Sequence, residues 1–275
     1  MKQVLIFGPT SWDTVIRIDK YPLNGGFVQS LMRDERAGGV GMNIAAAVSS
    51  ASIETLLYSY VGTDEIGKNL RKQMEEFEFS KENIKEIPGA SLHALITVDG
   101  TGERTIFALE KNRFPEINFH VNFSQNQIVV FPVWRDFYLP YLEMANAVRA
   151  NTVVGMGTIT NSTATASIMI GSEKDVSEFN PDFNRFKTTI ITRGAAGVKV
   201  ITAKDAKDAK EISVKSVKVE DATGAGDSFL SGVLVGLASG ATLDLAVRTG
   251  INWATAAVTE VSSVPPKWRE EFSLE

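Results

Sequence analysis

Short apolar runs alternate along the chain with longer segments whose apolar residues recur at helical spacing. The runs expected to form strands are rich in β-branched residues and span 3–7, 56–60, 127–131, 152–156, 189–192 and 198–202. The segments expected to form helices span 43–52, 67–76, 138–150, 229–238 and 243–261. Strands that alternate with helices predict an α/β fold, in which a mainly parallel sheet is covered by helices on both faces.

Two extended segments fall outside this alternation and predict a second, smaller sheet. Residues 14–18 form a β-branched run, and residues 92–109 read as two strands joined at Asp99-Gly100, a dipeptide typical of hairpin turns. Neither segment is followed by a helical partner. We therefore expect a small antiparallel sheet that acts as a lid, although an ordinary surface hairpin would give the same pattern.

The composition narrows the classes of protein that remain. The 275 residues are 44% hydrophobic and carry a net charge of -5 without a long basic block, so we expect no nucleic-acid partner. No apolar run reaches about 18 residues, so we expect no membrane partner. The absence of cysteine excludes disulfides and thiolate metal sites and favours a cytoplasmic location. The two histidines, His93 and His120, lack metal-ligand spacing and are expected to be surface or core residues.

The segment with the most chemical content is DATGAGD at residues 221–227, between a strand-like run at 212–219 and a helical segment. A Gly-x-Gly turn that opens a helix leaves backbone N–H groups free, and with the helix dipole they form a site for an anion such as phosphate. Beside such a site, the Asp227 carboxylate has two possible roles. It either caps the helix or takes the proton of a hydroxyl group that attacks the phosphate.

A second glycine cluster, AGGVGMNIA at residues 37–45, precedes an alanine-rich helical segment. Its backbone could approach a ligand closely, and Asn43 offers both a donor and an acceptor to a hydroxylated molecule. Close packing of the helix on the sheet would require the same small residues. Both interpretations remain open at this point.

Three other glycine-containing segments partly resemble nucleotide-binding motifs. TRGAAG at 192–197 lies between two strands and could line a nucleotide pocket, with Arg193 meeting phosphate, or could be a plain hairpin turn. GTDEIGKN at 62–69 fits the start of a P-loop, but Asn69 stands where that motif needs Ser or Thr. The first strand is followed by GPTS, which does not fit a dinucleotide-binding fingerprint.

Taken together, GGVGMN at residues 38–43 and DATGAGDSF at 221–229 resemble the two signatures of the ribokinase-like sugar kinases, the PfkB family. The resemblance runs over most of the chain and includes Gly8, Asp13, the 61–64 segment with Gly67, and the 192–197 turn. It implies a single ribokinase-like domain over residues 1–275. That fold is a three-layer α/β sandwich with a mainly parallel central sheet, helices on both faces, and a small β-sheet lid from segments at about 14–36 and 91–110.

The resemblance implies an ATP-dependent kinase that transfers the γ-phosphoryl group to a hydroxyl group of a small sugar, ribose- or fructose-like. A nucleoside kinase of the same family and a non-catalytic relative that binds nucleotide or sugar are the alternatives. The implied cofactors are ATP, Mg²⁺ and a monovalent cation such as K⁺. The implied partners are the sugar or nucleoside and a second copy of the chain, joined through the lid.

Family roles carried over to this chain give three groups of residues. Asp227 would be the general base, and the turn formed by Gly224, Ala225, Gly226 and Asp227 would supply the anion hole. Substrate hydroxyl groups would be held by Asp13, Gly38, Gly39 and Asn43. ATP would be bordered by Ser172, Thr192, Arg193, Gly194, Gly197 and Asn252.

The chain departs from the family pattern at two places. Ala222 stands where the family usually has threonine. The N-x-x-E motif, which contacts magnesium and phosphate through water in the family, should lie near residue 172, where the chain reads Ser172-Glu173-Lys174-Asp175. We expect Ser172 and Asp175 to be a shortened version of this motif, with Asp175 contacting Mg²⁺ through water.

Overall fold

The computed structural model describes residues 1–275 except 110–114, 158, 160–161, 203–208, 261–263 and 274–275. Its largest element is a nine-stranded sheet with the strand order β13-β12-β11-β10-β9-β8-β1-β4-β5. In that order the strands are Lys210–Ile212, Val198–Thr202, Phe186–Thr192, Ala166–Ser172, Asn151–Gly155, Gln127–Phe131, Gln3–Phe7, Thr55–Gly62 and Ile84–Ile87. Neighbouring strands are parallel except in the pairs β11–β12 and β12–β13. The expected mainly parallel sheet is confirmed.

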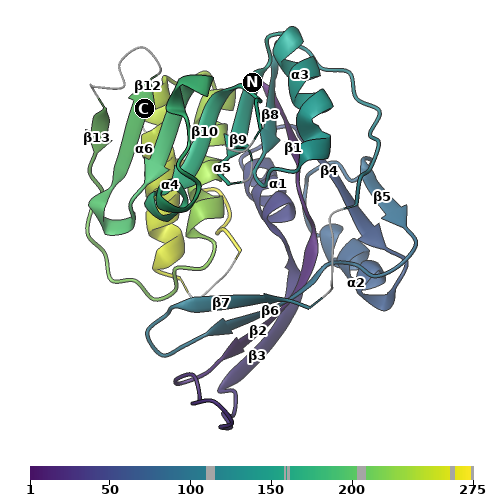
Figure 1. Ribbon diagram of the computed structural model, residues 1–275, viewed down its shortest axis with the longest axis vertical. Helices are drawn as coiled ribbons and strands as arrows, with labels where there is room; N and C mark the ends of the chain where they lie inside the picture. Colours follow the sequence, from purple (N-terminus) through teal and green to yellow (C-terminus); the bar gives the residue numbers. More distant parts are fainter. Residues whose placement is uncertain (110–114, 158, 160–161, 203–208, 261–263, 274–275) are drawn as a thin grey trace.

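Helices cover both faces of this sheet, so the expected three-layer architecture is confirmed (Figure 1). Along β1, Val4 and Ile6 point into one apolar core, whereas Leu5 and Phe7 point into the other. The first core is closed by α1 (Val40–Ser50), α2 (Glu65–Met74), α5 (Ala225–Ala238) and α6 (Leu243–Val258), and the second by α3 (Leu139–Ala147). A short helix, α4 (Glu173–Phe179), follows β10. Within the described residues, no helix combines the length and apolar character needed to cross a membrane.

A separate four-stranded sheet, here called the small sheet, lies beyond one end of the main sheet (Figure 1). Its order is β3-β2-β6-β7, formed by Met32–Gly38, Ser11–Arg17, His93–Val98 and Arg104–Ala108. The pairs β2–β3 and β6–β7 are antiparallel, but β2–β6 is parallel, so the sheet is mixed rather than antiparallel as expected. Only residues 8–10 separate β1 from β2, so the chain passes directly from the main sheet into the small one.

Several elements differ from their expected bounds for local reasons. Helix α1 begins at Val40 rather than 43, because Gly39 caps it with a φ of 91°. The strand-like run at 212–219 was wrong as a strand: β13 ends at Ile212, and residues 213–219 have no regular structure. The strands β3, β5 and β10 were not anticipated. The expected end of the last helix at residue 261 lies outside the described residues, and α6 ends at Val258.

Candidate active site

The start of α5 is the centre of the candidate site. Gly224 has a left-handed conformation, with φ 78°, and the helix begins at Ala225. The N–H of Ser228 donates to the Gly224 carbonyl at 2.9 Å, which closes the first helical turn. The N–H groups of the residues within that turn have no intrahelical acceptor, and the Ala225 N–H has only a long contact of 3.4 Å with Ala222 O. A Cβ on Gly226 would meet open space, so the backbone of this turn borders an accessible region.

Asp227, in the first turn of α5, is held by a residue from the N-terminal part of the chain. Asn43 Nδ2, on α1, donates a 2.9 Å hydrogen bond to Asp227 Oδ2. Burial raises the pKa of Asp227 to about 6, against the opposing effects of the Asn43 hydrogen bond and the positive charge of Arg104. The carboxylate of Asp13 raises this pKa further. The structure therefore brings three of the predicted site residues together.

Asp13 lies on β2 and is buried. Its Oδ1 accepts a 2.6 Å hydrogen bond from the Ser11 hydroxyl group. Burial raises the pKa of Asp13, while the Ser11 hydrogen bond and the charges of Arg36 and His93 oppose the increase. A Cβ on Gly38 would lie 2.1 Å from Asp13 Oδ2, so only glycine at position 38 leaves room for this carboxylate.

The neighbouring glycines are explained by packing. Gly39 has φ 91°, and a Cβ there would lie 2.7 Å from the Ser11 nitrogen. A Cβ on Gly41 would lie 2.5 Å from the carbonyl carbon of Gly8. The start of α1 is thus pressed against the turn between β1 and β2, as the packing interpretation of the sequence required. Direct contact of Gly38 or Gly39 with a substrate stays a prediction.

Three basic residues of the small sheet contribute charge that the sequence reasoning did not assign. The charges of Arg36 on β3 and His93 on β6 lower the pKa of Asp13. The charge of Arg104 on β7 lowers the pKa of Asp227. His93 is also tied into the sheet, with its Nε2 3.0 Å from Thr14 Oγ1. Pairing of β2 with β6 places His93 opposite Trp12, next to Asp13. The sequence does not reveal that β2 and β6 pair in parallel, so it could not predict that His93 lies near Asp13.

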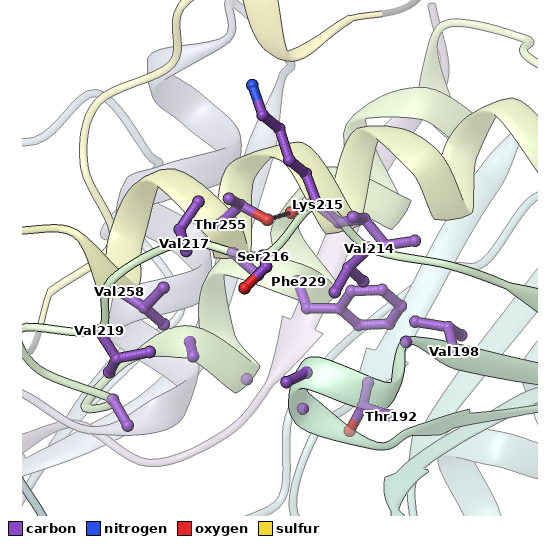
Figure 2. A pocket seen from close by; sticks show the side chains of 18 residues that line it. Thr192, Val198, Val214, Lys215, Ser216, Val217, Val219, Phe229, Thr255 and Val258 are labelled. Atoms are coloured by element: carbon purple, nitrogen blue, oxygen red, sulfur yellow. Dashed lines mark hydrogen bonds between the residues drawn. The ribbon is translucent and has the colours of Figure 1, made fainter.

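A pocket of about 290 Å³ lies beside the start of α5, at the carboxyl end of β11 (Figure 2). It is lined by residues 192, 194, 195, 197, 198, 214–217, 219, 222, 225, 226, 229, 251, 254, 255 and 258. Most of these are apolar or small, and Phe229 lies among the labelled side chains while the Lys215 amine points away from it (Figure 2). The residues after β13 that were expected to form a strand provide one wall of the pocket.

The predicted nucleotide-binding residues divide into two groups. Thr192, Gly194 and Gly197 line the pocket. Ser172, Arg193 and Asn252 are not among the lining residues. Arg193 Nη1 lies 3.2 Å from Glu211 Oε1, and Asn252 Nδ2 donates to the Phe272 carbonyl at 3.2 Å. On α6 the side of the helix that carries Thr255 and Val258 faces the pocket instead.

Ser172 and Asp175 form a reciprocal cap at the start of α4. Asp175 Oδ2 accepts the Ser172 N–H at 2.6 Å, and Ser172 Oγ accepts the Asp175 N–H at 3.2 Å. This arrangement is a capping box, so both residues have a structural role. Contact of Asp175 with Mg²⁺ stays a prediction. In the described part of the chain, no three or more His, Cys, Asp or Glu residues gather in a group that could hold a metal ion.

Comparison with known proteins gives a consistent result over nearly the whole chain. The model of the pfkB family carbohydrate kinases matches residues 1–132 and 126–269. An ATP-dependent ribose-1-phosphate kinase from Halopiger xanaduensis is 28% identical over 104 residues, which are 38% of this chain and 35% of that protein. The chain therefore spans about a third of the length of that relative. A ribokinase from Dictyostelium discoideum is 23% identical over 269 residues, covering 82% of this chain and 85% of that one.

Solved structures agree on the fold. The crystal structure of a ribokinase from Thermotoga maritima superposes with a TM-score of 0.79 at 19% identity. The superposition covers 99% of this chain and 98% of that one. At this level of identity the match shows that the fold is shared, including the small sheet beside the main one.

Proposed function

The chain belongs to the pfkB family of carbohydrate kinases, and from this premise we propose that it transfers the γ-phosphoryl group of ATP to a hydroxyl group of a small, ribose- or fructose-like sugar. The observation that supports this most directly is the position of Asp227. Its carboxylate has a raised pKa, is hydrogen-bonded to Asn43, and lies in the first turn of a helix beside the pocket. A carboxylate whose pKa is near the working pH is suited to general base catalysis.

ATP fits the pocket beside α5. Apolar side chains such as Val198, Val214 and Phe229 offer surfaces on which an adenine ring can pack. Ala225 and Gly226 line the same pocket, so a nucleotide bound there would direct its phosphates toward the amides of the first turn. These amides and the positive end of the helix dipole would stabilise the negative charge on the transferred group.

The acceptor sugar would lie on the other side of Asp227, between α1 and β2. Asn43 Oδ1 is buried and has no hydrogen-bond partner among the described residues, so it is available to accept a hydrogen bond from a sugar hydroxyl group. Asp13 is a second buried acceptor. In the step itself, the acceptor hydroxyl proton passes to Asp227, a new bond forms from the acceptor oxygen to the γ-phosphorus, and the bond from the γ-phosphorus to the bridging oxygen of ADP breaks.

In this proposal, Mg²⁺ would be bound mainly by the phosphates of ATP rather than by protein side chains. The described residues hold no cluster of three acidic or histidine side chains, which fits Mg²⁺ that is ligated mainly by phosphate oxygens and water. When bound, Mg²⁺ would neutralise charge on the phosphates. A monovalent cation such as K⁺ belongs to the same proposal, and its contribution is measured by comparing the rate in K⁺ with the rate in tetramethylammonium.

The small sheet is proposed to be the lid of the site, because the positive charges of two of its residues interact with the site carboxylates: Arg104 with Asp227 and Arg36 with Asp13. Covering the site would exclude water, which would otherwise compete with the sugar as acceptor. Strand β7 is exposed along its whole length, and Ile106 and Phe107 are 53% and 46% exposed. An exposed edge strand with apolar side chains supports the proposal of a homodimer formed through the lid.

The test is an acceptor panel. The protein is incubated with ATP, Mg²⁺ and single acceptors (ribose, fructose and several nucleosides), and phosphorylated product is detected by mass spectrometry. A phosphorylated pentose or hexose supports the proposed function, whereas turnover of nucleosides alone supports the nucleoside kinase. ATP binding without product for any acceptor would contradict catalysis and leave the non-catalytic relative.

A further inference from the structure

Arg17, at the end of β2, reaches across to the segment that precedes α5. Its Nη2 lies 2.6 Å from Asp221 Oδ2, although the two residues are 204 positions apart. The Asp221 side chain is only 3% exposed and that of Arg17 is 23% exposed, so the pair is largely shielded from water. Among the described residues, this is the ion pair that joins the small sheet to the 221–227 segment.

The second carboxylate oxygen of Asp221 accepts a hydrogen bond from the backbone of the same segment. Asp221 Oδ1 accepts a 2.8 Å hydrogen bond from the Thr223 N–H, immediately before Gly224 and the start of α5. The N–H groups of Glu220 and Asp221 both donate to the Val258 carbonyl, at 2.8 and 3.3 Å. One carboxylate therefore connects a residue of the small sheet with the turn that precedes Ala225 and Gly226, two of the residues that line the pocket.

The ion pair also neutralises the negative charge of Asp221 beside the turn. Asp221 and Asp227 flank the turn, and a bound polyphosphate would add more negative charge beside them. The Arg17 guanidinium neutralises Asp221, whereas the nearby Arg36 pairs with Asp34 at 3.2 Å and acts on Asp221 only at longer range. Without Arg17, Asp221 would be a buried carboxylate with no hydrogen-bonded cation, an unfavourable state that would displace the turn.

We propose that Arg17 is a positioning residue, whose ion pair with Asp221 couples the placement of the small sheet to the orientation of the amides of residues 225–227. This inference rests on the proposed kinase function for its catalytic consequence. It does not require Arg17 to touch either substrate.

The test replaces Arg17 with methionine, which keeps much of the side-chain length but removes the charge. Misplaced transition-state donors typically lower the rate by about 10- to 100-fold, so kcat of Arg17→Met should fall by that factor. The Kd for ATP, measured directly, should stay within about threefold, because the residues that line the pocket are untouched. Arg33→Met is the matched control, since Arg33 lies on β3 of the same sheet with a 66% exposed side chain.

Asp221→Asn breaks the ion pair from the other side and serves if Arg17→Met does not fold. We expect kcat to fall in this variant too, and the double variant to lose less than the product of the two single losses, because no uncompensated carboxylate remains. If kcat in both single variants stays within about twofold of the unmodified protein, the coupling is wrong.

A second readout separates this inference from the kinase proposal. Hydrogen–deuterium exchange of the peptide that contains residues 222–228 should be faster in Arg17→Met than in the unmodified protein and unchanged in Arg33→Met. If the unmodified protein phosphorylates no acceptor, the kinase proposal fails, and the exchange rates alone decide the positioning role. Equal exchange in all three proteins would overturn it.

Discussion

Asn43 and Asp227 are 184 residues apart in the sequence, and Asn43 Nδ2 lies 2.9 Å from Asp227 Oδ2. Each belongs to one of the two glycine-rich motifs, so the hydrogen bond joins the starts of α1 and α5 in one site. The bond also uses only one end of the Asn43 amide. Asn43 Oδ1, at the other end, has no hydrogen-bond partner among the described residues, and under the proposed function it would hold an acceptor hydroxyl group beside Asp227.

Asp227→Asn should remove transfer activity and preserve the fold. An amide cannot take the acceptor proton, and loss of a general base typically costs about 10²- to 10⁴-fold in rate. Asparagine has nearly the same shape, and its oxygen can still accept the Asn43 hydrogen bond. Steady-state rates and ATP affinity should be measured together. Full activity in a folded variant would refute the base, and loss of ATP binding would indicate a cap instead.

The rate should depend on pH through the same carboxylate. The pKa of Asp227 is raised to about 6, and the base acts only when it is ionised. We therefore expect kcat/KM to be constant above about pH 7 and to fall about tenfold per pH unit below the pKa. The measurement is a pH–rate profile with saturating ATP. A profile that stays flat down to about pH 4.5 would show that a group with an ordinary carboxyl pKa, or none, controls the rate.

The raised pKa also predicts a stability effect with a definite sign. Between pH 3.8, the ordinary pKa of an aspartate, and about pH 6, Asp227 binds more protons in the folded protein than in the unfolded chain. Protonation of Asp227 therefore stabilises the fold, and this stabilisation is lost as the pH rises through 6. Near pH 8 the ionised carboxylate therefore costs free energy, and Asp227→Asn should raise the free energy of unfolding by about 1–3 kcal/mol. Urea unfolding at two pH values checks this: the advantage of the variant should be larger near pH 8 than near pH 5.

Gly226→Ala tests the space in front of the first turn of α5. A Cβ at this position meets no atom within 4 Å and the residue lines the pocket, so the methyl group should not disturb the protein but should occupy room needed by phosphates. Alanine in a helix is favoured over glycine by about 0.5–1 kcal/mol, so the melting temperature should be unchanged or slightly higher. Activity should nevertheless fall by about 10-fold or more. A variant with normal activity would place the phosphates elsewhere.

Gly38→Ala tests how Asp13 is positioned. The added Cβ would lie 2.1 Å from Asp13 Oδ2, so the carboxylate must move. We expect the KM for the acceptor to rise by about 10-fold or more with little change in the Kd for ATP, because Asp13 is on the acceptor side of Asp227. Asp13→Asn is the companion variant, because it changes the charge of the side chain but keeps its shape. If Gly38→Ala weakens ATP binding instead, Asp13 does not belong to the acceptor side.

The sequence predicted most strands of the main sheet, because β1, β4, β8, β9, β11 and β12 are short apolar runs, but it missed β5 and β10. It was insufficient for β3, since MRDERAG is charged and mostly exposed at the edge of the small sheet. The run SVKSVKV at 213–219 is rich in valine like a strand, yet it lies beyond β13 and pairs with no strand in the described structure. The local sequence of a segment does not show whether a neighbouring strand is available to pair with it.

The two glycine motifs identified the centre of the site, but not the residues that surround it. Asn43 and Asp227 come together as expected, because each motif begins a helix at the same end of the main sheet. The contributions of Arg17, Arg36 and Arg104 depend on where the small sheet stands relative to α5, which no local pattern specifies. Asn252 lies on the expected helix, but on a face of α6 that does not line the pocket, and its side chain donates to the Phe272 carbonyl instead.

Among the described residues, those that line the pocket beside α5 all fall between Thr192 and Val258. The proposed acceptor residues Asp13, Gly38, Gly39 and Asn43 all come from the first 43 residues, and Asn43 contacts Asp227 of the C-terminal part. Under the proposed function, ATP and the acceptor would therefore be recognised by separate stretches of the chain. If so, new acceptor preferences can be selected from libraries confined to residues 11–43 and 93–108 in which Arg17 is kept, without changing the residues that line the pocket.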